Sequence, residues 1–301
     1  MLAAAPTANR PATLSRHLAA FFQLCKPRVN SLIVFTAMIG MCLASPDFPP
    51  IARLVVASLG IALVAFAAAA INCLVERTVD ALMLRTRWRP SARGDIGAME
   101  TLSFAMLLGG AGLWLLHSFI NDLTMGLTLA TFLGYAVVYT VVLKPATPMN
   151  IVIGGAAGAM PPVLGWTAMT GHLAPEPLVL FLIIFLWTPP HFWALACYRR
   201  DDYARAGFPM LPVTHGVEFT CQHILLYTLM LAAASLIPVS LGMSGWLYLA
   251  AVSVIDIGFI GLAVALCRRY SDGLARRTFR YSIIYLTLLF AALFADRLFT
   301  P

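Results

Sequence analysis

Charged side chains are scarce in this 301-residue chain: they make up 11% of the residues, and only 13 of them are acidic. Hydrophobic residues make up 60%, which leaves too little polar surface for a soluble globular protein of this length. Six cysteines occur without any Cys-x-x-Cys spacing, so they indicate neither a disulfide framework nor a zinc site. No Ser-rich, Gly-rich or charged linker divides the chain, and we therefore expect one all-α membrane domain.

The apolar residues gather in nine stretches, each near the ~20 residues that a helix needs to cross a bilayer. These stretches run over residues 29–45, 53–74, 100–118, 123–143, 150–170, 177–197, 224–243, 246–267 and 281–299. The pattern predicts a polytopic protein with nine transmembrane helices in one bundle around a central cavity. It assigns residues 1–28 to an N-terminal tail and residues 29–301 to a single membrane domain.

The basic residues fall in alternate gaps between these stretches. Of the 20 Lys and Arg residues, 18 lie in the tail or in the gaps after the second, fourth, sixth and eighth stretches. The two exceptions are Arg53 and Arg297. The positive-inside rule therefore predicts a cytoplasmic N-terminus and a periplasmic C-terminus. Because this topology already explains the net charge of +7, we expect the lipid bilayer as a partner and no nucleic acid. The tail contains Arg10 and Arg16 but no continuous apolar region, which favours a bacterial inner-membrane protein over one with a transit peptide.

The gap after the second stretch carries acids and arginines at helical spacing. If the second helix continues past Asn72, then Asn72, Glu76 and Asp80 follow one another along one face. Oxygen atoms at this spacing suit Mg²⁺, which carboxylates bind together with phosphate oxygens. Arg85 and Arg89, again four residues apart, carry the forked donors that bind a diphosphate. The alternative is a solvated helix end with mixed charges.

The gap after the sixth stretch has the same character. Tyr198 and Asp202 are four residues apart, so we expect a second polar row that faces the same way as the first. Two such rows can share two metals and one diphosphate. Two such gaps at corresponding positions also suggest two related halves. Before this gap, Pro189 and Pro190 predict a break or kink within the sixth helix.

A histidine and two tryptophans surround this proline pair. His191 follows it directly, and Trp187 and Trp193 flank it. A broken helix with these side chains suits a large planar ring, whereas a hydrogen-bonded core histidine and an interfacial aromatic belt are the alternatives. Lys144 is the only basic residue in its own gap, and it either binds a phosphate oxygen or only sets the topology.

Taken together, four segments carry a family resemblance, at residues 72–90, 139–144, 150–166 and 189–212. Their motifs are Asn72-x3-Glu76-x3-Asp80, Tyr139-Thr-x2-Leu-Lys144, Asn150-Ile-Val-Ile-Gly-Gly and Pro189-Pro-His-Phe-Trp, with Asp202-Tyr-x2-Ala-Gly-x-Pro-Met-Leu-Pro212. The first motif resembles the UbiA-type intramembrane prenyltransferases in general. The last two closely resemble the branch that modifies heme, the protoheme IX farnesyltransferases or heme O synthases.

The resemblance implies transfer of a farnesyl group from farnesyl diphosphate to a vinyl group of protoheme IX, with addition of water to give heme O. It implies Mg²⁺ as the cofactor and heme A synthase or terminal-oxidase assembly as partners. The implied catalytic and metal-binding residues are Asn72, Glu76, Asp80 and Asp202. The implied diphosphate-binding residues are Arg85, Arg89 and Lys144, and the implied heme-binding residues are His191, Trp187, Trp193 and Tyr198.

Two positions depart from the pattern of the resemblance. Glu76 stands where many relatives have Asp, which keeps the charge but alters the metal geometry. Lys144 is followed by Pro145 where a second basic residue is common, so the phosphate site is one charge weaker. The competing hypotheses are a UbiA-type enzyme that prenylates a quinone or chlorin precursor, and a transporter with broken helices. Against a transporter, the polar residues gather near one face and few lie at the midplane.

Overall fold

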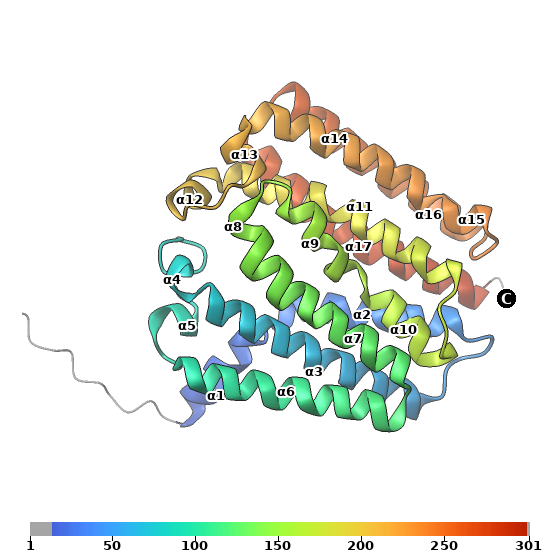
Figure 1. Ribbon diagram of the computed structural model, residues 1–301. Helices are drawn as coiled ribbons and strands as arrows, with labels where there is room; N and C mark the ends of the chain where they lie inside the picture. The colour runs from blue at the N-terminus through green and yellow to red at the C-terminus, as the bar shows by residue number, and fades with distance from the viewer. Residues whose placement is uncertain (1–13, 300–301) are drawn as a thin grey trace, which may run out of the picture.

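Long apolar helices dominate the computed structural model, which describes residues 14–299 (Figure 1). Nine spans in this range are long and apolar enough to cross a membrane. They are α2 (Pro27–Ala44), α3 (Ile51–Val75), α6 (Ala98–Phe119), α7 (Asp122–Leu133) with the π-helical segment η1 (Gly134–Leu143) and α8 (Lys144–Ala146), α9 (Asn150–Ala159) with α10 (Pro161–Thr170), α11 (Pro175–Tyr198), α14 (Gly216–Ser235) with α15 (Ile237–Ser240), α16 (Trp246–Arg268) and α17 (Asp272–Phe299). The predicted number of spans and the all-α class are confirmed.

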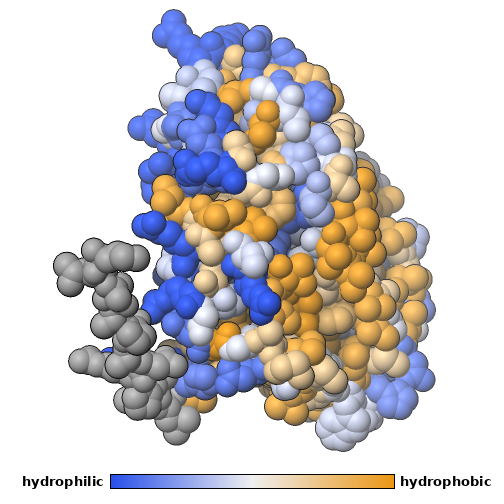
Figure 2. Space-filling model, turned by 60° about the vertical axis from the view of Figure 1, so that its left-hand side comes forward, coloured by the Kyte–Doolittle hydropathy of each residue, from blue (hydrophilic) through white to orange (hydrophobic). Residues whose placement is uncertain are grey.

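Short helices join the spans at one end of the bundle, which we call the charged end. They are α4 (Arg77–Asp80), α5 (Pro90–Arg93), α12 (Arg200–Arg205) and α13 (Leu211–Thr214), at the left of Figure 1 with α8. The two long gaps of the sequence therefore lie at the same end. Figure 2 shows hydrophilic residues gathered over this end and hydrophobic residues over the side that would face lipid.

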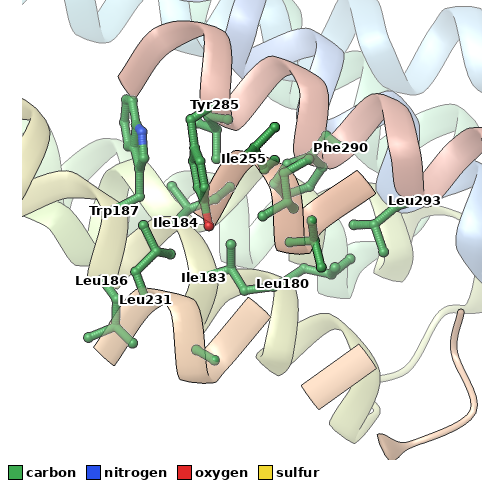
Figure 3. Close-up of a cluster of buried hydrophobic side chains, with 14 of the residues drawn as sticks. Leu180, Ile183, Ile184, Leu186, Trp187, Leu231, Ile255, Tyr285, Phe290 and Leu293 are labelled. Carbon is green, nitrogen blue, oxygen red and sulfur yellow. The ribbon is translucent and has the colours of Figure 1, made fainter. Parts of the chain in front are cut away.

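The largest apolar core holds the C-terminal half together. Its buried residues come mainly from α11, α14, α16 and α17. In Figure 3, Leu180 and Ile183 of α11 lie beside Tyr285, Phe290 and Leu293 of α17. These five side chains are almost fully buried, which fixes α11 against α17. This contact orients the face of α11 that carries Trp187 and His191.

Glycines allow α2 and α10 to pack backbone to backbone. A Cβ added to Gly165 would lie 1.9 Å from the carbonyl oxygen of Ala37, and one added to Gly40 would lie 2.3 Å from that of Pro162. Only glycine fits at either position, because an added methyl group meets backbone that cannot rotate away.

The structure differs from the sequence prediction at three places. Of the break or kink predicted at Pro189 and Pro190, the break does not occur, because α11 continues through both prolines. The Thr188 hydroxyl, just before the proline pair, donates to the Ile184 carbonyl at 2.8 Å. An interruption occurs instead at Met160, between α9 and α10 and directly before two other consecutive prolines.

The other two differences concern helix ends. The last helix begins at Asp272, well before the predicted residue 281, because hydropathy detects only the apolar part of a helix that continues beyond the bilayer. Within the predicted tail, residues Leu14–Leu24 form the helix α1, which packs on α3 and α5. The remainder of the tail, residues 1–13, lies outside the described residues.

Candidate active site

The first polar row lies where α3 passes into α4. Val75 ends α3 and Arg77 begins α4, yet the backbone pattern is nearly continuous. The Glu76 N–H donates to the Asn72 carbonyl at 3.0 Å, and the Asp80 N–H donates to the Glu76 carbonyl at 2.7 Å. These i to i+4 bonds keep the three side chains on one face, as the spacing predicted. All three are at least 94% buried.

Asn72 is the hub of a buried hydrogen-bond network. Its Oδ1 accepts from Nζ of Lys26 at 2.5 Å. Its Nδ2 donates to Oε1 of Glu76 at 2.8 Å and to Oγ1 of Thr140 at 3.2 Å. The same Glu76 oxygen accepts from Nζ of Lys144 at 2.5 Å. Residues from α3, η1, α8 and the start of α2 therefore meet at one point.

Asp80 anchors the loop that follows α4. Its carboxylate accepts from Nη1 of Arg89 at 2.6 Å, and its backbone carbonyl accepts from the Thr86 hydroxyl at 3.1 Å. Nη1 of Arg89 also lies 3.9 Å from a Glu76 carboxylate oxygen. Arg85 lies in the same loop, and its buried Nε has no hydrogen-bond partner within residues 14–299. The loop thus carries Arg89, which pairs with the acids, and Arg85, whose Nε remains free to donate a hydrogen bond to a ligand.

The pKa shifts at this site follow from burial and from opposite charges. Burial alone would raise the pKa of Glu76, but the nearby ammonium groups of Lys144 and Lys26 hold it below its usual range. Burial lowers the pKa of Lys26, which the surrounding acids only partly oppose. Burial also acts to lower the pKa of Arg89, but the Asp80 carboxylate raises it above its usual value. Acids and bases in this network stabilise each other's charged forms.

The second polar row lies in the segment that follows α11, at the same charged end of the bundle. Asp202 of α12 is 96% buried and forms ion pairs with Arg205 and, at 3.5 Å, with Arg199. Its Oδ2 is buried and accepts no hydrogen bond within the described part of the chain. Tyr198 lies under two guanidinium groups, with Arg199 at 5.6 Å and Arg276 at 5.3 Å from its ring centroid.

Apolar contacts bring the two gaps together. Met83 from the first gap belongs to the same buried cluster as Tyr203 and Met210 from the second. Lys144 connects them as well, because its Nζ lies 4.7 Å from the ring centroid of Phe208 while it donates to Glu76. Of the expected site residues, the structure thus collects those of the first gap with Lys144 and packs the second gap against them.

The donor set fits Mg²⁺ in its chemistry. Asn72, Glu76 and Asp80 present an amide and two carboxylates along one face, and Asp202 offers a buried oxygen without a hydrogen bond. The carboxylates of the first row contact basic side chains rather than one another. No three His, Cys, Asp or Glu side chains form a metal-binding group between residues 14 and 299. Joint binding of one metal by all four residues therefore remains a prediction.

The aromatic residues of α11 separate into two groups. Trp187 and His191 lie one turn apart and stack with their centroids 4.3 Å apart, facing α17. Trp193 faces α14 instead, where it is fully buried and meets the Tyr227 ring at 5.3 Å. This division follows from the helix, because residues six apart differ by roughly 240° in direction. The expected pocket of both tryptophans and the histidine therefore does not form around a single point.

Sequence reasoning missed Lys26, Thr140 and Ser282. Lys26 entered only as a topology-setting charge, although it precedes Pro27 at the first turn of α2 and is the only non-glycine residue with positive φ, 46°, among the described residues. Thr140 lies in η1, whose π-helical geometry has no strong sequence signal. The backbone carbonyl of Ser282 in α17 accepts from the indole Nε1 of Trp187 at 2.7 Å, and its Oγ lies 2.7 Å from Nδ1 of His191.

Comparison with known proteins places this geometry in a family. The profile of the UbiA prenyltransferase family matches residues 33–292. The chain is 79% identical over 285 residues to a protoheme IX farnesyltransferase of Dechloromonas aromatica, covering 95% of this chain and 96% of that one. It is 62% identical over 285 residues to the protein of the same name from Cupriavidus metallidurans, covering 94% and 93%.

Solved structures agree with this comparison at the level of the fold. A digeranylgeranylglyceryl phosphate synthase superposes with a TM-score of 0.78 at 19% identity, covering 93% of this chain and 98% of that one. A UbiA homologue from Archaeoglobus fulgidus, bound to GPP and Mg²⁺, superposes with a TM-score of 0.61 at 16% identity, covering 91% and 99%. The chain belongs to the UbiA prenyltransferase family.

Proposed function

We propose that this protein transfers the farnesyl group of farnesyl diphosphate to a vinyl group of protoheme IX, with addition of water, to give heme O and diphosphate. The observation that carries the proposal is the 79% identity, over nearly the full length of both chains, to a protein named for farnesylation of protoheme IX. The buried network of acids and bases at the charged end supports it, because such a network suits a metal–diphosphate complex.

Within this proposal, Asn72, Glu76, Asp80 and Asp202 would hold Mg²⁺, which would supply positive charge to the departing diphosphate. A Mg²⁺–diphosphate complex contains both cations and anions. Its metal ion would therefore bind the carboxylates, and its phosphate oxygens would accept hydrogen bonds from Lys144, Arg85 and Arg89. The present pairs of Lys144 with Glu76 and of Arg89 with Asp80 keep these charges matched before substrate binds.

The proposed reaction replaces the bond from the farnesyl chain to diphosphate with a bond to the porphyrin. The bond between C1 of the farnesyl chain and the diphosphate oxygen breaks, and its electron pair leaves with the diphosphate. The terminal vinyl carbon of the porphyrin forms a bond to C1, water adds to the other vinyl carbon, and one proton is released. Electrostatic stabilisation of the leaving group by the arginines and Lys144 is the main contribution of this chain. An active site that excludes water protects the allylic cation from reaction with water before it reaches the porphyrin.

We propose that the protein lies in the inner membrane of a bacterium, with its charged end in the cytoplasm. The relatives with high identity are bacterial, and the nine apolar spans suit a multi-pass protein. The alternate distribution of basic residues supports the orientation. The proposed product places heme A synthase or terminal-oxidase assembly next in sequence as the consumer of heme O.

A panel of acceptors tests the proposal. Purified protein in lipid nanodiscs receives farnesyl diphosphate, Mg²⁺ and either protoheme IX, an aromatic quinone precursor or a chlorin, and diphosphate release is measured. We expect release with protoheme and none in the Asp80→Asn variant. Asp122→Asn is the matched control, because Asp122 is exposed and, among the described residues, pairs only with His117 at the opposite end. Release with the quinone precursor but not with protoheme contradicts the proposal.

A further inference from the structure

A cavity of about 350 Å³ lies among the helix ends opposite the charged end. The short helix α15 and the C-terminal end of α17 mark this end at the right of Figure 1. The cavity is lined by the ends of α2 and α17, the start of α11, part of α10 and the loop after α15. The 24 residues of α11, roughly 36 Å of helix, separate it from the charged end.

Two opposite charges line this cavity without forming an ion pair. Glu176 of α11 is half-buried, and its carboxylate has neither a hydrogen bond nor an ion pair among residues 14–299. Arg297 of α17 donates from Nη2 to the carbonyls of Ser45, at 3.0 Å, and of Pro46. Because a guanidinium carries five N–H donors, Nε and Nη1 of Arg297 keep three for a ligand. An acid and a base arranged in this way suit a ligand that carries both charges.

A third polar group in the cavity wall also lacks a partner. The indole Nε1 of Trp166 in α10 is buried and makes no hydrogen bond within the described part of the chain. Buried donors are rarely left unpaired unless water or a ligand binds them. The cavity thus offers N–H donors from Trp166 and Arg297 and an acceptor from Glu176.

The surroundings of the cavity indicate a lipid as its ligand. Leu43 and Met243 add apolar wall, and Leu241, which also lines the cavity, is 53% exposed. Trp114 and Trp246, toward the same end, are 59% and 72% exposed, which is typical of indoles at the boundary between bilayer and water. A volume of about 350 Å³ is near the lower limit of small-molecule sites, roughly 300–1,000 Å³. It therefore suits a head group whose acyl chains remain in the bilayer.

We propose that this cavity binds the head group of a phosphatidylethanolamine molecule from the leaflet at this end of the bundle. The N–H groups of Arg297 and Trp166 donate to the phosphate oxygens, as charge-assisted and neutral hydrogen bonds respectively. The primary ammonium group donates to the Glu176 carboxylate. A phospholipid without the amine leaves Glu176 unpaired beside a second negative charge, so the site discriminates against it.

Native mass spectrometry of delipidated protein in detergent tests the proposal. The protein is titrated with phosphatidylethanolamine or with phosphatidylglycerol of the same acyl chains, and the lipid-bound fraction gives each dissociation constant. We expect the wild type to bind one phosphatidylethanolamine at least about tenfold more tightly, the size of a hydrogen bond to a charged group. Glu176→Gln should abolish this preference. Trp166→Phe should weaken the binding of both lipids, because both carry the phosphate.

Two matched variants control for the general effects of these changes. Glu218→Gln removes an exposed acid from the first turn of α14, as Glu176→Gln does from the first turn of α11. Trp246→Phe removes an exposed indole at the same end as Trp166. Both controls should keep the wild-type preference. Because Glu176 has no partner among the described residues, Glu176→Gln should unfold at the wild-type temperature in the absence of lipid.

Three results would overturn the proposal. The first is equal affinity of the wild type for the two lipids, and the second is a wild-type preference in Glu176→Gln. The third is displacement of the bound lipid by soluble O-phosphoethanolamine at an equal concentration, which would assign the cavity to a soluble ligand. Thermal unfolding gives an independent measurement, because a ligand that binds only the folded protein raises its unfolding temperature. Phosphatidylethanolamine should raise this temperature for the wild type more than for Glu176→Gln.

Discussion

Replacing Lys144 by Met removes one partner of a buried ion pair at the site. Nζ of Lys144 donates to Oε1 of Glu76 at 2.5 Å, and the two side chains are only 12% and 7% exposed. Loss of one member of a buried pair costs about 3–5 kcal/mol, because the other charge stays buried. The Asn72 amide still donates to the same oxygen at 2.8 Å, so we expect the lower end, about 3 kcal/mol.

The same variant should bind farnesyl diphosphate less tightly. A hydrogen bond to a charged group contributes about 1.5–3 kcal/mol. Its loss corresponds to a rise in the dissociation constant of about 10- to 150-fold. Isothermal titration with a non-reactive farnesyl diphosphate analogue in the presence of Mg²⁺ measures this change, and denaturant unfolding measures the stability.

A second substitution separates the two effects. Combining Lys144→Met with Glu76→Gln removes both charges, and the free energy of unfolding should recover by about 2 kcal/mol relative to Lys144→Met alone. Affinity for the analogue should not recover, because both side chains are needed for the metal–diphosphate complex. Unchanged stability and unchanged affinity in Lys144→Met would refute the reasoning about this pair.

Three further predictions concern packing, buried hydrogen bonds and pH. Gly165→Ala should destabilise the protein by about 1–3 kcal/mol or more, because the added Cβ meets the backbone of α2. Gly158→Ala should not, because the space around Gly158 is open, and thermal unfolding in detergent compares the two variants. Tyr285→Phe should cost about 1–3 kcal/mol, because it removes a donor to a buried carboxylate. Tyr270→Phe, at a half-buried residue whose hydroxyl bond to Asp272 is exposed, should cost under about 0.5 kcal/mol, and equal losses would contradict this reasoning. The Glu76 carboxylate stabilises the fold fully above the ordinary glutamate pKa of about 4.3, and this contribution is lost as the pH falls through the lowered pKa of Glu76 in the folded protein. Glu76→Gln should therefore make the free energy of unfolding depend less on pH between these two pKa values, as measured by acid unfolding.

The fold followed from the sequence because hydropathy reports directly on membrane burial. The second stretch, predicted at residues 53–74, is the helix Ile51–Val75, and the other apolar spans differ mainly at their ends. The largest difference is at Asp272, where helical hydrogen bonding continues through a charged segment that hydropathy does not detect. Sequence patterns specify where a helix is apolar more accurately than where it ends.

The candidate site was less predictable because most of it depends on contacts between helices. The spacing of Asn72, Glu76 and Asp80 follows from a local period, so the sequence sufficed for that row. The contact of Lys26 with Asn72 joins residues 46 positions apart, and no local pattern indicates it. Proline likewise has a local effect that its surroundings can offset, which is why α11 does not break at Pro189 and Pro190.

The mass of the heme product tests the central proposal most directly. Protein in nanodiscs is incubated with protoheme IX, farnesyl diphosphate and Mg²⁺ in water enriched in ¹⁸O, and the extracted porphyrins are analysed by mass spectrometry. The proposal predicts a porphyrin that carries one farnesyl group and one hydroxyl whose oxygen comes from the labelled water. Recovery of unmodified protoheme while the diphosphate is consumed, or of a farnesylated porphyrin without the labelled oxygen, would contradict it.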